Sequence, residues 1–341
     1  LEGIPRGATA LFMKIHHAVL DGKGALRLVS SFHSRDPEPG SPLRADAMPA
    51  QDPRDNDFSP PSIVAKYGRA WWHSIERPIE MTATLAKLLP QLLHPGDHED
   101  KKASPPVPHS YFNHPVAADR VIGHVRMDMA RLRKLEKKYS CTINDIAVCV
   151  VAGAMRDFLD EKNELPTDDL RAMMALDIRK PSESGAIGNH VIMAKISLYS
   201  GIADPAERLR AIHKETLAGK KRSKSGSSRA MLELLDEIHP ATIFWLGDWL
   251  VSSGRIDKLP QTANTVITNV PGIRGDAYIG DAKLIDYLGF GPLAPNMGLF
   301  HTVSSTTEQV NISFLSTADF VQDGAGYTVA LESSWGEVAG L

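Results

Sequence analysis

The chain has 341 residues, of which 43% are hydrophobic and 23% charged, a composition that suits a globular protein of one large or two smaller domains. Its formal net charge of -3 excludes bulk attraction to nucleic acid. The longest apolar run, Ile146 to Met155, is too short to span a bilayer, and no secretory signal is visible. We therefore expect a cytoplasmic protein that meets a membrane or lipid droplet only from the side.

The two cysteines, Cys141 and Cys149, fall in or beside one expected helix, eight residues apart. At about 1.5 Å per residue along a helix, that spacing is too long for a disulfide, so we expect free thiols and a reducing compartment. No Gly-rich phosphate loop follows an expected strand. Neither a metal nor a bound cofactor is predicted.

The first element in chain order is an apolar run, residues 10–15, which predicts a short and mostly buried strand. The motif HHAVLDG follows from His16 to Gly22, and residues 24–29 read as helical. The motif therefore sits at a turn from strand to helix. Histidine titrates near neutral pH and Asp21 is close enough in sequence to orient an imidazole, which is the chemistry of a general base.

Three other readings of this motif stay open. Asp21 and Gly22 form a common turn dipeptide with no need of a catalytic role. His16 and His17 are neighbours on an expected strand end, so their side chains point to opposite faces and at most one faces a cavity. A metal site built on His17 and Asp21 is conceivable, but no third ligand lies at a recognisable spacing.

The remaining elements divide the chain at a linker. We expect an exposed Pro-rich linker over 36–61, helices over 62–94 broken at Pro78, and a second linker over 95–108, which we take as the domain boundary. Beyond it the patterns predict strands over 120–127, 170–179, 190–199, 265–269, 283–287, 299–305 and 309–316, and helices over 130–139, 144–160, 204–221, 231–253 and 327–338. The predicted fold class is mixed α/β.

Two polar stretches in this second part have both a functional and a structural reading. Thr142 is a good N-cap for the helix over 144–160, with Asp145 in its first turn, so Asn144 and Asp145 can serve helix capping as well as a site. Residues 220–229 carry five positive and no negative side chains, and could hold a phosphate by charge or form a solvated loop.

The whole HHAVLDG string matches the HHxxxDG signature of the CoA-dependent acyltransferase superfamily, and its surroundings resemble the bacterial wax ester synthase/diacylglycerol acyltransferase family. The resemblance continues through three later segments in the family's order: Thr142-Ile143-Asn144-Asp145, Asp177-Ile178-Arg179-Lys180-Pro181 and Ile267-Thr268-Asn269-Val270-Pro271-Gly272. Together these four segments are far more specific than any one of them.

The resemblance implies a two-domain chloramphenicol acetyltransferase-like fold with a tunnel between the domains. Residues 1–108 would be the remainder of the N-terminal domain, truncated at its N-terminal side, and residues 109–341 the C-terminal domain. Family members carry a substantial segment before the histidine motif, so we expect a processed or nicked protein whose front segment is a separate chain or is lost. The implied activity is transfer of a long-chain acyl group from acyl-CoA, a substrate and not a cofactor, to a fatty alcohol or diacylglycerol.

The resemblance also assigns roles to individual residues. His17 is the expected base that takes the alcohol proton, while His16 shapes the turn. Asp21 is expected to hold the turn by pairing with Arg179, and Gly22 allows tight passage of the backbone. Asn144 and Asp145 support the site. Asn269 either donates toward the oxyanion or braces its loop, and we favour bracing.

Two functions of other classes are compatible with the fold. A condensation-type enzyme that uses carrier-protein thioesters shares the HHxxxDG signature, although the segments around Asn144 and Asn269 argue against it. A non-catalytic protein of the lipid-droplet surface could keep the same fold, although intact His16, His17 and Asp21 weigh against that reading.

Overall fold

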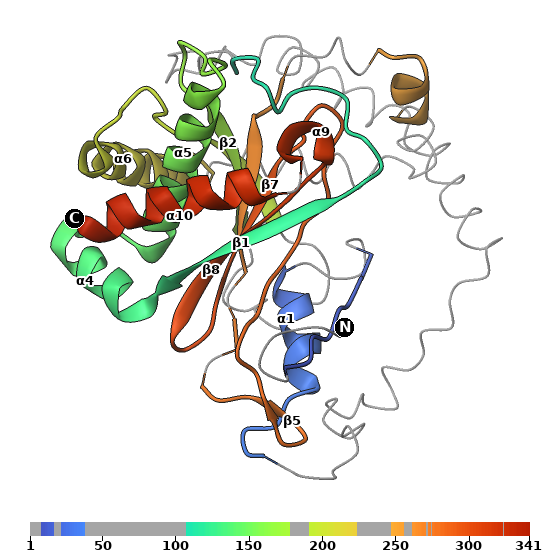
Figure 1. The fold of residues 1–341 in the computed structure, drawn as a ribbon, viewed down its shortest axis with the longest axis vertical. Helices are drawn as coiled ribbons and strands as arrows, with labels where there is room; N and C mark the ends of the chain where they lie inside the picture. Colours follow the sequence, from blue (N-terminus) through green and yellow to red (C-terminus); the bar gives the residue numbers. More distant parts are fainter. Residues whose placement is uncertain are drawn as a thin grey trace, which may run out of the picture.

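The computed structural model describes residues 8–16, 22–37, 107–177, 191–223, 247–255, 261–270, 272–273, 275–322 and 324–341. These parts form a mixed α/β body around one six-stranded sheet (Figure 1). Its strands, in spatial order, are β1 (Val121–Asp128), β8 (Gln309–Ser316), β7 (Phe300–Ser305), β4 (Thr265–Val270), β2 (Arg171–Asp177) and β3 (Val191–Ser197). β4 runs parallel to both of its neighbours, and the other pairs are antiparallel.

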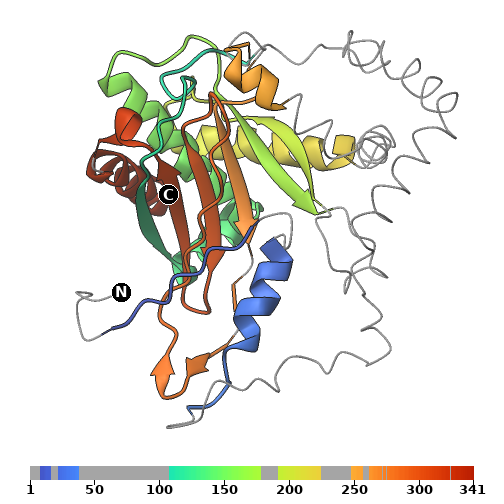
Figure 2. The same ribbon diagram turned by 90° about the vertical axis from the view of Figure 1, so that its right-hand side faces the viewer.

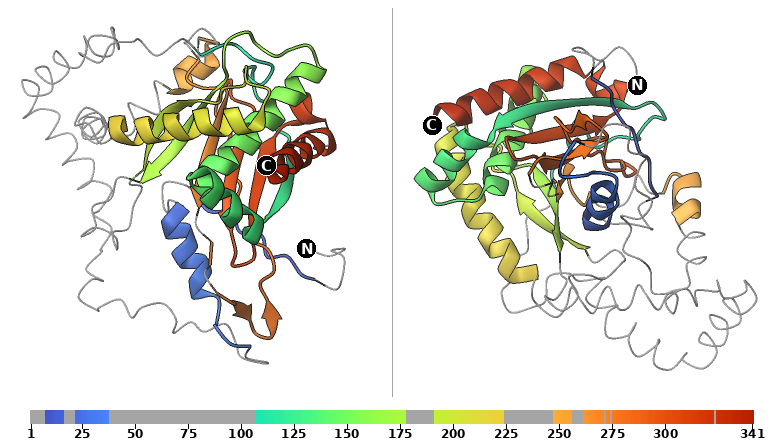
Figure 3. Two further views of the ribbon diagram at one scale, coloured as in Figure 1. Left: turned by 90° about the vertical axis from the view of Figure 1, so that its left-hand side faces the viewer. Right: turned by 90° about the horizontal axis from the view of Figure 1, so that it is seen from below.

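Helices cover one face of this sheet, as the two views of Figure 3 show. They are α4 (Met129–Tyr139), α5 (Ile143–Glu161), α6 (Pro205–Ser223) and α10 (Ala325–Gly340), with the short α9 (Ala318–Val321) leading into α10. α5 is the central helix, since residues 145–155 are all buried. A helix that is apolar on all sides has to lie inside the body, and α5 accordingly packs against both α6 and α10.

The sheet presents apolar side chains to these helices. Along β8, Val310, Ile312 and Phe314 belong to the main hydrophobic core, together with side chains from all four helices. The alternating Asn311 and Ser313 point to the opposite face, because successive residues of a strand face opposite ways. That second face is buried as well, although its side chains are polar.

A coil segment over 284–293, here called the strap, crosses the polar face. The hydroxyls of Ser304 and Ser313 donate to the backbone carbonyls of Tyr287 and Gly289 in the strap. Asn311 Nδ2 donates to Asp286 Oδ1 at 2.9 Å, and Gln309 Nε2 donates to the same oxygen at 2.6 Å. Main-chain and carboxylate acceptors of the strap thus take the hydrogen bonds that these sheet side chains donate, while the buried Oδ1 of Asn311 has no hydrogen-bond partner among the described residues.

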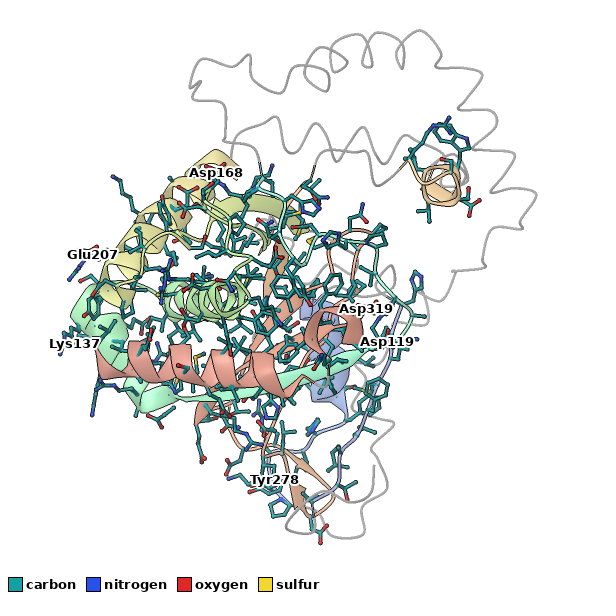
Figure 4. The ribbon with its side chains drawn as sticks, turned by 45° about the horizontal axis from the view of Figure 1, so that its top comes forward. Asp119, Lys137, Asp168, Glu207, Tyr278 and Asp319 are labelled. Carbon is teal, nitrogen blue, oxygen red and sulfur yellow. The ribbon has the colours of Figure 1, made fainter. Side chains whose placement is uncertain are left out.

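The strap follows a two-stranded hairpin, β5 (Tyr278–Ile279) and β6 (Ala282–Lys283). Figure 4 shows Tyr278 at the opposite end of the molecule from Asp168, which lies in the loop before β2. Ser34 forms an isolated antiparallel bridge to Tyr278, so the chain just after α1 (Gly22–Ser31) is joined to this hairpin.

A neutral histidine lies inside the core between β7 and α10. His301 is fully buried; its Nδ1 lies 2.9 Å from Thr265 Oγ1 and its Nε2 lies 2.8 Å from the Tyr327 hydroxyl. Thr265 also donates to the Leu299 carbonyl, so its oxygen accepts from Nδ1–H, and Tyr327 donates to Nε2. Burial lowers the pKa of His301 to about 3, and it raises the pKa of Tyr327.

Two predicted strands are wrong. Residues 10–15 form no strand: they are non-regular, and Leu11 and Phe12 are 66% and 68% exposed. An apolar run becomes a buried strand only where a neighbour pairs with it, and none of the described strands does. The predicted strand over 283–287 ends at Lys283, where β6 ends, because the next residues enter the strap.

The other predictions on described residues are confirmed to within a few residues at each element end, and β8 matches residue for residue. The two cysteines are free and buried. Several predictions concern residues that the structure does not describe: most of the first predicted linker (38–61), the predicted helices over 62–94, most of the second predicted linker (95–106), and residues 178–190 and 224–246. The domain boundary therefore stays a prediction.

Candidate functional site

The first turn of α5 is built by a reciprocal cap. Thr142 Oγ1 accepts from the Asp145 backbone N–H at 3.2 Å, and the Thr142 backbone N–H donates to Asp145 Oδ2 at 2.9 Å. This capping box confirms Thr142 as the N-cap and satisfies two donors at the helix start. It also fixes the direction of Asn144, which lies between the two.

Asp145 is a buried carboxylate that joins α5 to α6. Its side chain is 1% exposed, and it accepts from Thr216 Oγ1 at 2.6 Å and from His213 Nδ1 at 2.8 Å. Burial by itself raises the pKa of Asp145, but the hydrogen bonds from Thr216, Thr142 and His213 outweigh it and leave the pKa below its ordinary value. The carboxylate is therefore ionised at neutral pH, and Nδ1 of His213 carries the hydrogen between them.

Asn144 points to the end of β4. Asn269 Nδ2 donates to Asn144 Oδ1 at 3.4 Å, and Asn144 Nδ2 lies 3.4 Å from Met174 Sδ on β2. Asn269 reaches Asn144 because it stands opposite Val303 in the register of β4 and β7, on the face that the helices cover. Two residues that are 125 positions apart in the sequence thus meet at the start of α5.

The helix that follows the histidine motif lies at the same end of β4. Figure 2 shows the upper end of α1 beside the arrowhead of β4, and α1 contacts this strand. Val29 of α1 forms a small apolar cluster with Ile273 and Ala277, which follow β4 in the chain. α1 therefore packs against the segment that follows β4, beside the end of that strand.

Gly272 is required by a close approach at this strand end. A Cβ built on Gly272 would lie 1.3 Å from the Ser305 carbonyl oxygen, a distance at which atoms cannot coexist. Its backbone N–H donates to Ser305 Oγ at 3.3 Å. The chain can turn directly after β4 only because this position has no side chain.

The sequence-predicted site residues fall into two groups. The structure brings Asn144, Asp145 and Asn269 together, whereas His17, Asp21 and Arg179 lie outside the described residues. Of the remaining two, His16 ends the exposed segment over 8–16, and Gly22 is the first residue of α1.

Sequence reasoning missed His213 and Thr216. They stand three residues apart on α6, on one face of the helix, in line with the buried Leu209 and Ile212. A polar side chain within the apolar stripe of a helix predicts that it has a buried polar partner. The pattern of α6 does not identify that partner as Asp145.

The cysteines lie apart from this group. Burial raises the pKa of both Cys141 and Cys149 to about 11, so each is a thiol and a weak nucleophile at neutral pH. In the described ranges, no three His, Cys, Asp or Glu side chains gather as metal ligands do. None of the helices searched in those ranges is both long and apolar enough for a bilayer span.

The class of fold is shown by solved structures. The epimerization domain from the third module of tyrocidine synthetase B aligns with a TM-score of 0.50 at 13% identity, over 96% of this chain and 67% of that one. The wax ester synthase/diacylglycerol acyltransferase from Marinobacter aquaeolei VT8 aligns with a TM-score of 0.61 at 22% identity, over 96% of this chain and 68% of that one. The fold is the predicted mixed α/β, chloramphenicol acetyltransferase-like class.

The family follows from the sequence. Residues 1–147 match the wax ester synthase/diacylglycerol acyltransferase catalytic domain, and residues 187–338 match the C-terminal domain of the same family. O-acyltransferase WSD of Acinetobacter baylyi is 27% identical over 93% of this chain and 67% of its own length. A protein of Mycobacterium tuberculosis named as a diacylglycerol O-acyltransferase is 27% identical over 100% of this chain and 70% of its own. The chain belongs to the wax ester synthase/diacylglycerol acyltransferase family of O-acyltransferases, as the four sequence segments predict.

Proposed function

We propose that this protein moves a long-chain acyl group from acyl-CoA to the hydroxyl of a fatty alcohol or a diacylglycerol. Family membership supports O-acyl transfer. The observation that carries the proposal further is the contact between Asn144 and Asn269 at the end of β4, beside the helix that starts at Gly22. Three of the four family segments are thereby represented in one region of the fold.

The proposed chemistry needs one base and no covalent enzyme intermediate. His17 takes the proton of the acceptor hydroxyl as its oxygen attacks the thioester carbonyl, and returns the proton to the departing CoA sulfur. The products are an ester and free CoA thiol, so atoms and charge balance. The raised pKa values of Cys141 and Cys149 support direct transfer, since neither thiol is prepared to act as a nucleophile.

The supporting residues keep the base in place. In this proposal His16 shapes the turn, Asp21 pairs with Arg179 to hold it, and Gly22 opens α1. Asn269 braces the site: its amide donates to Asn144 Oδ1, and this contact supports the bracing role.

Contact with lipid is proposed to be peripheral. Trp249 is 41% exposed and Val251 is 54% exposed on the same short helical stretch, and the guanidinium of Arg255 lies 4.6 Å from the Trp249 ring centroid. An exposed Trp beside a cation suits the boundary between water and lipid.

The test is incubation of the chain with palmitoyl-CoA and either hexadecanol or a diacylglycerol, followed by free-thiol release and lipid analysis. We expect thiol release only with an acceptor, and a matching amount of wax ester or triacylglycerol. His17→Ala should lower the rate by roughly 100-fold or more, the usual worth of a general base, with an unchanged circular dichroism spectrum. Substantial turnover by that variant would contradict His17 as the base.

Asp21→Asn separates a structural role from a catalytic one. If Asp21 holds the turn by charge, the variant loses activity and its melting temperature falls, because Asn keeps the shape but not the charge. An unchanged melting temperature together with lost activity would contradict the structural role.

A further inference from the structure

We propose that His213 and Thr216 on α6 are positioning residues for the transfer reaction, acting through Asp145 to hold the first turn of α5 where Asn144 meets Asn269. This inference rests on the proposed function, and it adds two residues that lie outside the four short sequence segments on which the resemblance was based. We call the four residues Thr142, Asp145, His213 and Thr216 the α5 clamp.

The clamp uses both oxygens of one carboxylate. Thr216 Oγ1 donates to Oδ1 at 2.6 Å, while His213 Nδ1 and the Thr142 backbone N–H donate to Oδ2 at 2.8 and 2.9 Å. Thr216 is 1% exposed, as is Asp145. A buried charge with donors from two helices fixes the geometry of both, because loss of one donor leaves the carboxylate poorly solvated.

The clamp acts at one place along α5. Its carboxylate belongs to the residue directly after Asn144, so a shift of the first turn moves the Asn144 amide with it. A polar tie from another helix lies farther along α5: Ser334 Oγ of α10 donates to the Val150 carbonyl at 2.9 Å. At about 1.5 Å per residue, that tie is roughly 9 Å from Asn144 along the helix axis.

The contact of Asn144 with Asn269 is sensitive to such a shift. At 3.4 Å the bond between their side chains is already long, so a small displacement of the first turn would break it. The Nδ1 hydrogen of His213 is present in the neutral Nδ1–H tautomer and in the imidazolium, so the clamp works in either state. Its function is to hold geometry.

The experiment compares paired substitutions at the clamp with a control at the distant tie. Thr216→Val and His213→Phe remove a donor at nearly constant shape. Thr216→Ser and His213→Asn restore one, since the Asn amide nitrogen occupies about the place of Nδ1. Ser334→Ala removes a buried hydroxyl that holds the same helix at Val150. For each variant we would measure kcat and KM for palmitoyl-CoA with hexadecanol, and the melting temperature.

We expect Thr216→Val and His213→Phe to lower kcat roughly 10- to 100-fold, the effect of a small misplacement near a reacting centre, with KM little changed. The Ser and Asn variants should recover most of kcat. Ser334→Ala should lower the melting temperature by a similar amount but leave kcat near that of the parent chain. An equal loss of kcat in Ser334→Ala, or no recovery in the restoring variants, would overturn the proposal.

Hydrogen exchange gives a readout that does not depend on turnover. In the peptide that contains residues 142–148, exchange should be faster in Thr216→Val and His213→Phe than in Ser334→Ala, because the clamp holds that turn whereas Ser334 bonds α5 farther along, at Val150. Unchanged exchange there would overturn the clamp even in an active enzyme. A parent chain that releases no CoA would contradict the proposed function, while the exchange result would still show whether the clamp orders Asn144.

Discussion

Along β7 and β8 the two faces of the central sheet are both buried, but the segments that cover them differ in chemistry. The helix face packs Ile312 and Phe314 into one apolar core with α5 and α10. The strap face packs Asn311, Ser313 and Ser304 under main-chain carbonyls of a coil segment. The first face is stabilised by removal of apolar surface from water, whereas the second depends on hydrogen bonds donated by its polar side chains.

This difference decides how each face responds to substitution. Loss of apolar volume leaves a cavity whose cost grows with the atoms removed. Loss of one hydrogen-bonding partner leaves the other buried and unsatisfied. This lowers the free energy of unfolding by less than a large cavity does, and the effect stays near the site of the substitution. Substitutions on the two faces should therefore differ in how much stability is lost and in how much of the structure is affected.

The largest loss should come from Phe314→Ala on the helix face. Phe314 is fully buried, and its ring centroid lies 4.9 Å from that of Tyr327. Removing the ring should lower the free energy of unfolding by about 3–5 kcal/mol, as measured by urea denaturation. A loss below about 1 kcal/mol would mean that this face is not the main source of stability.

A smaller and local loss is expected from Asp286→Ala on the strap face. Asp286 accepts from Gln309, Asn311 and Arg126, so its removal leaves the buried Asn311 amide without this acceptor. We expect the free energy of unfolding to fall by about 1–3 kcal/mol. Hydrogen exchange should become faster in the strap only. Arg126→Ala is the control: its side chain is 58% exposed, and its loss should cost less than about 1 kcal/mol. Equal costs for the two variants would contradict the burial argument.

The last expected effect depends on pH and concerns His301, the one imidazole described within the helix-face core. In the unfolded chain His301 binds a proton below about pH 6.5, whereas burial holds its folded pKa at about 3. Between these values the unfolded chain binds more protons, so stability falls with falling pH by about 1.4 kcal/mol per unit. His301→Gln lacks this titration. The difference in free energy of unfolding between the parent chain and this variant should therefore become smaller from pH 6.5 to 5. A gap that stays constant would contradict a neutral buried His301.

The helix face could be predicted from the sequence, and the strap face could not. Periodicity predicts β8 and α5 because apolar residues recur with the period of each element and meet in one core. Residues 283–287 alternate like a strand, but they lie across the sheet, since their carbonyls accept from sheet side chains. Residues 10–15 are apolar enough for a strand, but pairing depends on a neighbour that the local sequence cannot specify.

The candidate site shows the same division. Thr142 and Asp145 could be assigned from the sequence because capping is local. The family segments assigned Asn144 and Asn269 to one site, but the contact between them was not predicted. The contribution of α6 could not be foreseen. Thr216 reaches Asp145 across 71 positions of the chain, and no local pattern encodes such a distance.

Gly272 gives the last segment of the family signature a geometric meaning. Even the smallest side chain at this position would collide with the Ser305 carbonyl and push the end of β4 away from β7. Asn269 would move with the strand, out of reach of its partner on α5. Because Gly272 has no methyl group, the ends of β4 and β7 can lie close together. That spacing in turn decides whether the Asn269 amide, three residues earlier, reaches Asn144.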